Sequence, residues 1–142
     1  MDNSNVIHEG GCICGEVRYR VRGEPTAALV CHCTFCQRRT GSAFAITVYF
    51  DEANVEIVSG NPSMHEHRSD ESGRWLRREF CPKCGTTIGH TAELRPGQRA
   101  IAGGTFDNRD WFTVRQHIWA RSKLPWVAIP DNFKPKPPEG QS

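Results

Sequence analysis

Seven cysteines in three tight clusters constrain this chain more than any other feature. They lie in the segments 12–14, 31–36 and 81–84. Because seven is an odd number, disulfide bonds cannot pair all of them, whereas seven thiolates divide naturally into four plus three. A Cys₄ set is the closed tetrahedral environment of a structural zinc, and a Cys₃ set leaves one coordination position open, as catalytic zinc requires. The count therefore predicts two zinc ions per chain, one for stability and one for chemistry.

Length and composition limit the other classes of protein. The 142 residues are enough for one domain with a real core, although only 37% of them are hydrophobic. A formal net charge of +2 is too small to indicate a nucleic-acid partner. The first residues lack a signal-peptide pattern, and no run of about 18 apolar residues indicates a membrane span. We therefore expect a cytoplasmic protein, where clustered cysteines are metal ligands more often than disulfides.

Alternating apolar and polar residues predict a mainly β fold with many short strands. The clearest pattern is Phe44–Phe50, and Val17–Val21 alternates in the same way. No stretch keeps a 3.6-residue apolar period over three turns, so helix is limited to single turns at Gln37–Thr40 and Asn108–Phe112. The further predicted strands are Val55–Val58, Met64–Arg68, Trp75–Phe80, Arg99–Ala102 and Thr113–Trp119.

The ends of the chain differ in composition from its middle. Residues 1–10 are expected to be a short lead-in, and residues 131–142 are a polar segment with three prolines that is typical of a flexible tail. The segment between them, 11–130, is predicted to form a single zinc-binding domain.

The spacing within the clusters suggests how they bind metal. Cys81 and Cys84 are separated by two residues and followed by Gly85, which is the pattern of a zinc knuckle. Cys12 and Cys14 would share one face of a strand, and with the knuckle they would complete a Cys₄ set. Cys31, Cys33 and Cys36 then form a local Cys₃ set. Spacing alone leaves alternatives open: Cys31 and Cys33 could join the knuckle, or one structural zinc could leave three spare thiols.

Four motifs, taken in order, resemble one enzyme family. They are Gly11-Cys12-Ile13-Cys14-Gly15, the segment from Cys31 to Phe44 (CHCTFCQRRTGSAF), Phe80-Cys81-Pro82-Lys83-Cys84-Gly85 and the segment from His117 to Trp126 (HIWARSKLPW). Together they resemble the glutathione-dependent formaldehyde-activating enzyme family, S-(hydroxymethyl)glutathione synthase-like proteins with a centromere-protein-V-type zinc domain. The resemblance extends from about residue 8 to about residue 131.

The resemblance implies a fold, a ligand set and an activity. The fold is a β-tent of antiparallel sheets crosslinked by zinc, shared with a Rab-binding accessory factor. The implied structural zinc ligands are Cys12, Cys14, Cys81 and Cys84, and the implied catalytic ligands are Cys31, Cys33 and Cys36. The implied reaction joins a small thiol, glutathione, to an aldehyde, formaldehyde, and belongs to carbon–sulfur lyase chemistry. The alternative is a non-catalytic zinc-binding module on the same fold, acting as a protein-interaction scaffold or as a metal or thiol buffer.

Other polar and aromatic residues are weaker candidates. Arg38 and Arg39 follow the second cluster and would suit substrate carboxylates, although a solvated turn explains either one alone somewhat better. The same choice applies to His117, Arg121 and Lys123 in the last motif. The expectation for the histidines is structural or solvated: His32 points away from the metal, and His65, His67 and His90 lack evident partners. Trp75, Phe80, Trp111, Trp119 and Trp126 are expected in the core or a pocket wall.

Overall fold

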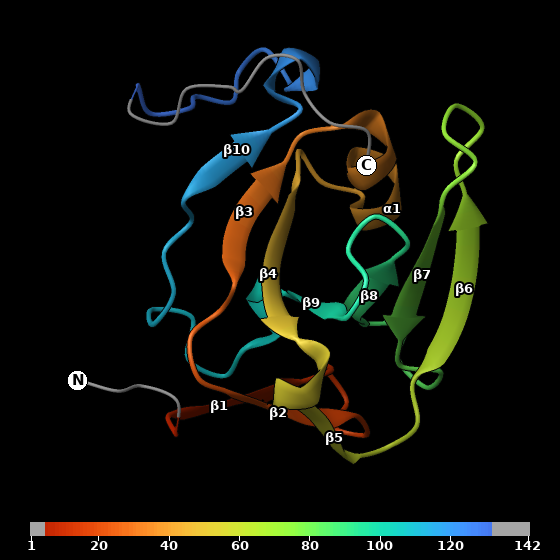
Figure 1. Ribbon diagram of the computed structural model, residues 1–142, viewed down its shortest axis with the longest axis vertical. Coiled ribbons are helices and arrows are strands. Elements are labelled where there is room, and N and C mark those ends of the chain that lie inside the picture. The colour runs from red at the N-terminus through yellow and green to blue at the C-terminus, as the bar shows by residue number, and fades with distance from the viewer. Residues whose placement is uncertain (1–4, 132–142) are drawn as a thin grey trace.

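Two β-sheets and one short α-helix make up residues 5–131, which is the part of the chain that the computed structural model describes (Figure 1). The smaller sheet has the strand order β1-β2-β5, with β1 at Ile7–Gly11, β2 at Arg18–Arg22 and β5 at Val55–Ser59. The larger sheet has the order β10-β3-β4-β9-β8-β7-β6. Its strands are β3 (Ala27–Cys31), β4 (Ala45–Asp51), β6 (Ser63–Arg68), β7 (Trp75–Phe80), β8 (Thr87–Ala92), β9 (Gln98–Ala102) and β10 (Gln116–Ile118).

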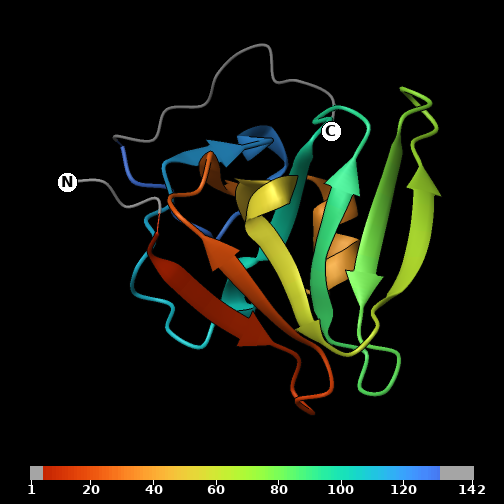
Figure 2. The same cartoon turned by 60° about the horizontal axis from the view of Figure 1, so that its bottom comes forward.

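The helical segments are short. Helix α1 spans Thr34–Thr40, and three single 3₁₀ turns lie at Glu52–Asn54, Gly103–Thr105 and Ala120–Ser122. Figure 2 shows how little of the molecule is helical beside the strands. The prediction of a mainly β protein is therefore confirmed. No helix in residues 5–131 is long and apolar enough to cross a bilayer.

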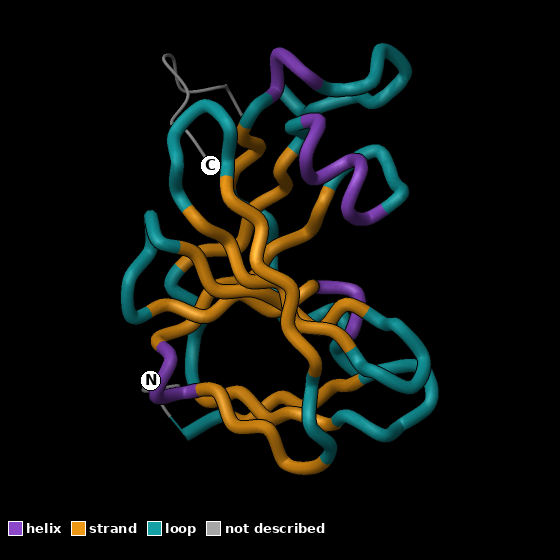
Figure 3. The backbone as a smooth tube through the Cα atoms, turned by 90° about the vertical axis from the view of Figure 1, so that its right-hand side faces the viewer, coloured by secondary structure: helices purple, strands orange, loops and turns teal. Residues whose placement is uncertain are grey.

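The hydrophobic core lies between the two sheets, which pack against each other at one end of the molecule (Figure 3). Tyr19 and Val21 of β2 face Phe50 of β4, and all three are fully buried. Phe106, also fully buried, packs edge-on against Tyr19 with ring centroids 5.5 Å apart. Burying aromatic rings of this size removes a large apolar area from water, so this cluster is the main source of hydrophobic stabilisation.

Strand β4 separates the core from the opposite face of the larger sheet. Val48 and Phe50 point into the core, whereas Thr47 and Tyr49 line a cavity on the other side. Successive side chains in a strand point to opposite faces, so the alternation predicted for this segment sets which residues are packed and which are available to a ligand.

Helix α1 begins directly after the cysteine pair of its own motif. The Cys33 sulfur accepts a hydrogen bond from the Cys36 backbone N–H at 3.3 Å and so caps the first turn. Gly41 ends the helix in the left-handed conformation, with φ at 65°. The predicted turn at Gln37–Thr40 is thus part of a slightly longer helix, and Cys33 and Cys36 are three residues apart at its start.

Several elements differ from the sequence expectations. Strands β1, β3 and β8 were not predicted, and all of β1 except Gly11 lies within the segment 1–10 expected to precede the domain. The helical turn predicted at Asn108–Phe112 is wrong, because this segment is an irregular connection. Strand β10 pairs with β3 in parallel, so the larger sheet is mixed rather than purely antiparallel. The tail predicted from residue 131 lies almost entirely outside the described residues.

Candidate metal centres and substrate cavity

Cys12, Cys14, Cys81 and Cys84 come together at the turns that follow β1 and β7. Their four sulfurs lie within 4.8 Å of one another, with Cys14 3.6 Å from Cys12 and 3.8 Å from Cys81. A tetrahedral site with Zn–S bonds of about 2.3 Å places its sulfurs about 3.8 Å apart. The donor set and its spacing therefore fit a zinc ion.

The backbone around this four-cysteine cluster also suits thiolates. The Val17 N–H donates to the Cys12 sulfur at 3.2 Å, and the Lys83 and Cys84 N–H groups donate to the Cys81 sulfur at 3.4 Å. Hydrogen bonds of this kind stabilise the charged form of a ligand. The prediction that Cys12 and Cys14 share a strand face is wrong: they lie in the turn after β1, where a bend brings both sulfurs to one point.

The pKa values of Cys14 and Cys84 are shifted in opposite directions. Hydrogen bonds from the Thr86 side chain and backbone lower the pKa of Cys84 to about 5. Although the Glu16 backbone N–H favours the Cys14 thiolate, desolvation and the three neighbouring sulfurs raise the pKa of Cys14 to about 12. Four negative charges so close together repel one another, so full ionisation needs a cation in their midst.

Cys31, Cys33 and Cys36 form a second, separate cluster. Their sulfurs also lie within 4.8 Å of one another, and only 4, 7 and 6% of these residues is exposed. Cys31 is the last residue of β3, and the other two belong to the cap and first turn of α1. The neighbouring Cys33 and Cys36 thiols, and then burial, raise the pKa of Cys31. Three buried sulfurs at this separation are a donor set that fits a metal better than free thiolates.

None of the seven cysteines forms a disulfide bond. Neither Cys31 nor Cys33 joins Cys81 and Cys84, so the sulfurs divide into the four-plus-three grouping. The roles of the two clusters as structural and catalytic zinc sites stay predictions.

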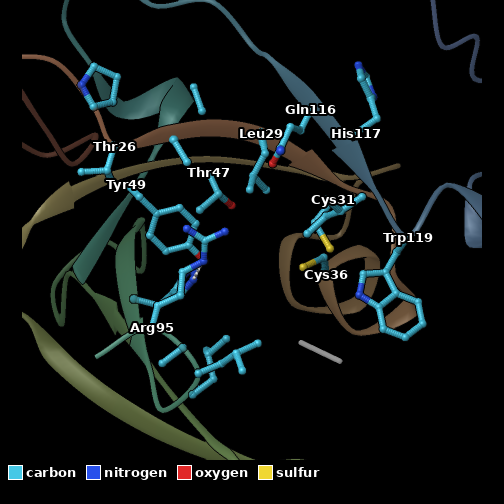
Figure 4. A pocket seen from close by; sticks show the side chains of 18 of the residues that line it. Thr26, Leu29, Cys31, Cys36, Thr47, Tyr49, Arg95, Gln116, His117 and Trp119 are labelled. Carbon is cyan, nitrogen blue, oxygen red and sulfur yellow. Dashed lines mark hydrogen bonds between the residues drawn. The ribbon is translucent and has the colours of Figure 1, made fainter. Parts of the chain in front are cut away.

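A cavity of about 1070 Å³ opens beside the three-cysteine cluster (Figure 4). Cys31 and Cys36 lie in its wall, and the Cys₄ residues do not line it. In Figure 4 the sulfurs of Cys31 and Cys36 face the hollow from one side, while Tyr49 and Arg95 lie on the opposite side. Apolar walls come from Leu29 and from a set of aromatic residues: Phe35, Trp75, Trp111, Phe112 and Trp119.

The polar lining of this cavity is strongly basic. Arg39, Arg74, Arg95 and Arg115 contribute to the wall, against one acidic residue, Glu24. None of the four arginines makes an ion pair within 4.0 Å in the described part of the chain, where the arginines in ion pairs are Arg18, Arg20, Arg68, Arg77 and Arg99. A pocket with this excess of guanidinium groups attracts anions.

The family model described as glutathione-dependent formaldehyde-activating enzyme matches residues 7–122. The chain belongs to that family. It is 27% identical over 138 residues to a Halomonas elongata protein provisionally named as such an enzyme, and the match covers 94% of this chain and 72% of that protein.

The fold has a relative among solved structures as well. The crystal structure of a Rhodobacter sphaeroides protein superimposes with a TM-score of 0.56 and 24% sequence identity, covering 75% of this chain and 96% of that one. At this identity the likeness concerns the fold alone. The resemblance found in the sequence motifs is confirmed by the family match, which includes all seven cysteines.

Two of the weaker basic candidates lie in the cavity wall of this family member. Arg39 donates a hydrogen bond to the Cys36 sulfur at 3.6 Å, and His117 also lines the cavity. Arg38, Arg121 and Lys123 do not contribute to the wall that the structure describes, and the Arg121 guanidinium lies 4.3 Å from the Trp119 ring. The sequence reasoning missed Arg74, Arg95 and Arg115, which lie in separate connections and share no motif.

The histidines take positions that spacing could not define. His32 is fully buried and turned away from the cysteines, with its Nε2 3.0 Å from Nδ1 of His117. His90 is 5% exposed and lies 3.3 Å from the Tyr49 hydroxyl. His67 on edge strand β6 stacks on Phe35 of α1, with ring centroids 4.4 Å apart. His67 and His90 therefore help to form the cavity, contrary to the expectation that they lack partners.

Proposed function

We propose that this protein is a zinc-dependent enzyme of the carbon–sulfur lyase type that acts on a small thiol and an aldehyde, with glutathione and formaldehyde as the leading pair. The observation that supports this is the location of the three-cysteine cluster in the wall of a large basic cavity, while the four-cysteine cluster lies outside it. A cluster that only stabilised the fold would not need access to such a cavity.

Cys31, Cys33 and Cys36 would hold the catalytic ion, and Cys12, Cys14, Cys81 and Cys84 the structural one. A zinc ion held by these three thiolates would supply a cation that keeps a substrate thiol ionised at neutral pH. The aromatic wall excludes water from the sulfur, and the arginines bind the anionic parts of the thiol. In the reaction the sulfur–carbon bond forms, the carbon–oxygen double bond becomes single, and the thiol proton ends on the aldehyde oxygen.

The finer fold assignment is part of the same proposal. The four-cysteine cluster joins the turn after β1 in the smaller sheet to the turn after β7 in the larger one. Zinc at this point would crosslink the two sheets of a β-tent at the edge of their shared core. Seven cysteines outside any disulfide bond also suit the reducing cytoplasm that we propose as the location.

The experiment is exchange NMR of glutathione with formaldehyde, because the two combine spontaneously and product formation alone is uninformative. We expect the wild-type protein to exchange them faster than buffer does, and Cys36→Ser to return to the buffer rate with one fewer zinc ion per chain. The control is Arg38→Gln, which changes an exposed side chain on the same helix and should behave as wild type.

Circular dichroism checks that each variant keeps the fold. A wild-type protein that holds two zinc ions yet leaves the exchange rate at the buffer value would contradict the enzyme and favour the non-catalytic zinc module.

A further inference from the structure

We propose that Arg39, Tyr49, His90 and Arg95 form a carboxylate-binding subsite beside the three-cysteine cluster, and that the thiol substrate therefore bears a carboxylate. We call these four residues the arginine subsite. This inference rests on the proposed function for the identity of the substrate as a thiol, and it adds the chemical group by which the cavity selects among thiols.

Tyr49 is the platform of the arginine subsite. The Arg95 guanidinium lies 4.1 Å from the centre of the Tyr49 ring, a cation–π contact that holds it at the cavity wall. The Tyr49 hydroxyl is in turn 3.3 Å from Nε2 of His90, and the two rings meet at 90°. Figure 4 shows Arg95 against Tyr49, across the hollow from Cys31 and Cys36. The guanidinium is thus held in place rather than free to follow solvent.

Arg39 connects this platform to the cysteines. Its terminal nitrogen donates to the Cys36 sulfur at 3.6 Å, while its buried Nε finds no hydrogen-bond acceptor among residues 5–131. A buried donor without an acceptor is costly, and an anion in the cavity would satisfy it. Arg39 can therefore contact a ligand that reaches from the sulfur cluster toward Tyr49.

The two guanidinium groups converge on the same region. Burial, followed by the charges of Arg39 and Arg95, lowers the pKa of His90 to about 3, so this ring stays neutral at physiological pH and does not balance the charge of the two arginines. No carboxylate lies within ion-pair distance of either arginine in the described chain, and the one acidic residue of the cavity wall is Glu24. Two like charges held near one neutral ring repel each other until an anion lies between them.

A carboxylate matches this arrangement better than other anionic groups of a thiol substrate. The planar guanidinium presents paired donors that fit the two oxygens of a carboxylate, and charge-assisted hydrogen bonds are the strong ones. A neutral thiol of similar size would leave both arginines unpaired. The arginine subsite therefore selects thiols that carry a carboxylate, and glutathione offers two sources, its glycyl and its γ-glutamyl carboxylate.

The test measures binding rather than turnover. The zinc-loaded full chain is titrated with three probes: S-methylglutathione, which has no free thiol, its glycyl monoethyl ester and its diethyl ester. Binding is measured as quenching of the fluorescence of Trp75 and Trp119, which lie in the cavity wall. We expect Arg95→Gln and Arg39→Gln to weaken binding of S-methylglutathione at least tenfold, as loss of a charge-assisted hydrogen bond does. Arg38→Gln is the matched control, since the same change is made at an exposed position.

The esters identify the carboxylate. If the arginine substitutions no longer weaken binding of the monoester, the arginine subsite binds the glycyl carboxylate. If they still weaken binding of the monoester but not of the diester, it binds the γ-glutamyl carboxylate. The inference is overturned if Arg95→Gln weakens binding no more than Arg38→Gln, if the diester is as sensitive to the substitutions as the parent, or if the wild type binds none of the probes. These results are independent of the exchange rate, so the subsite can fail while the proposed reaction holds, and the reverse.

Discussion

Cys14 offers the cleanest measure of what the four-cysteine cluster contributes to stability. Its side chain is exposed, so Cys14→Ser leaves no cavity in the core, yet its sulfur lies 3.6 Å from Cys12 and 3.8 Å from Cys81. If these sulfurs share a zinc ion, the substitution removes a crosslink between the turn after β1 and the turn after β7. We expect the variant to lose one zinc ion and a large part of its resistance to heat.

The size of the loss follows from the loop that the crosslink closes. Cys14 and Cys81 are 67 residues apart in the chain. Treating the metal bridge like a covalent crosslink, closure of a loop of this length contributes about 4 kcal/mol at 25 °C by restricting the unfolded chain. A domain of this size loses about 2–4 °C in Tm for each kcal/mol. Cys14→Ser should therefore melt roughly 10–15 °C below the wild type.

Differential scanning calorimetry measures the Tm, and inductively coupled plasma mass spectrometry counts the zinc on the same samples. Ile13→Ser is the control, because Ile13 occupies the same turn and is 89% exposed. It should keep both zinc ions and melt within a degree or two of the wild type. The reasoning is refuted if Cys14→Ser retains two ions per chain and melts together with Ile13→Ser.

Two further predictions concern the core and the cavity. Phe106 is fully buried against four aromatic rings, so Phe106→Ala should lower the free energy of unfolding by about 3–5 kcal/mol in urea titration, and a loss below about 1 kcal/mol would contradict its place in the core. Burial, together with the charges of Arg39 and Arg95, lowers the folded-state pKa of His90 from 6.5 to about 3. Between these two pH values the unfolded chain binds a proton at His90 that the folded chain does not bind. The free energy of unfolding therefore decreases as the pH falls below 6.5. From about pH 7.5 to about pH 5.5 the wild type should lose about 1.4 kcal/mol more than His90→Gln in the same titration, and equal losses would refute this.

The sequence predicted the strands whose two faces differ. Val48 and Phe50 alternate with Thr47 and Tyr49 because one face of β4 meets the core and the other meets the cavity. Strand β3 was missed for the opposite reason: both of its faces are buried, so Ala27–Cys31 shows no alternation. Strand β8 was missed because Gly89 and polar residues give it the composition of a turn, whereas Gly89 packs directly against the Ala100 carbonyl of β9.

The candidate site divides in a similar way. The knuckle and the short-range triad were predictable because they depend on local spacing, which the sequence records directly, whereas spacing left open which cysteine pair joins the knuckle. The arginine subsite was not, because its members come from α1, β4, β8 and the connection before β9. No local pattern links Arg39 with Arg95. Only the tertiary fold brings them to one cavity.

Sequence by itself therefore determined the mainly β class, the family and the three local cysteine motifs, since each motif is a run of residues close together in the chain. The fold then joined two of these motifs into the four-cysteine cluster and left the remaining one as the three-cysteine cluster. Tertiary structure alone decided where those groups lie: the four-cysteine cluster at a junction between the two sheets, and the three-cysteine cluster in the wall of a basic cavity. The physical reason is that thiol spacing is a local property. The access of a ligand to a thiol, and the charge around that thiol, depend on residues from distant segments that only the fold brings together.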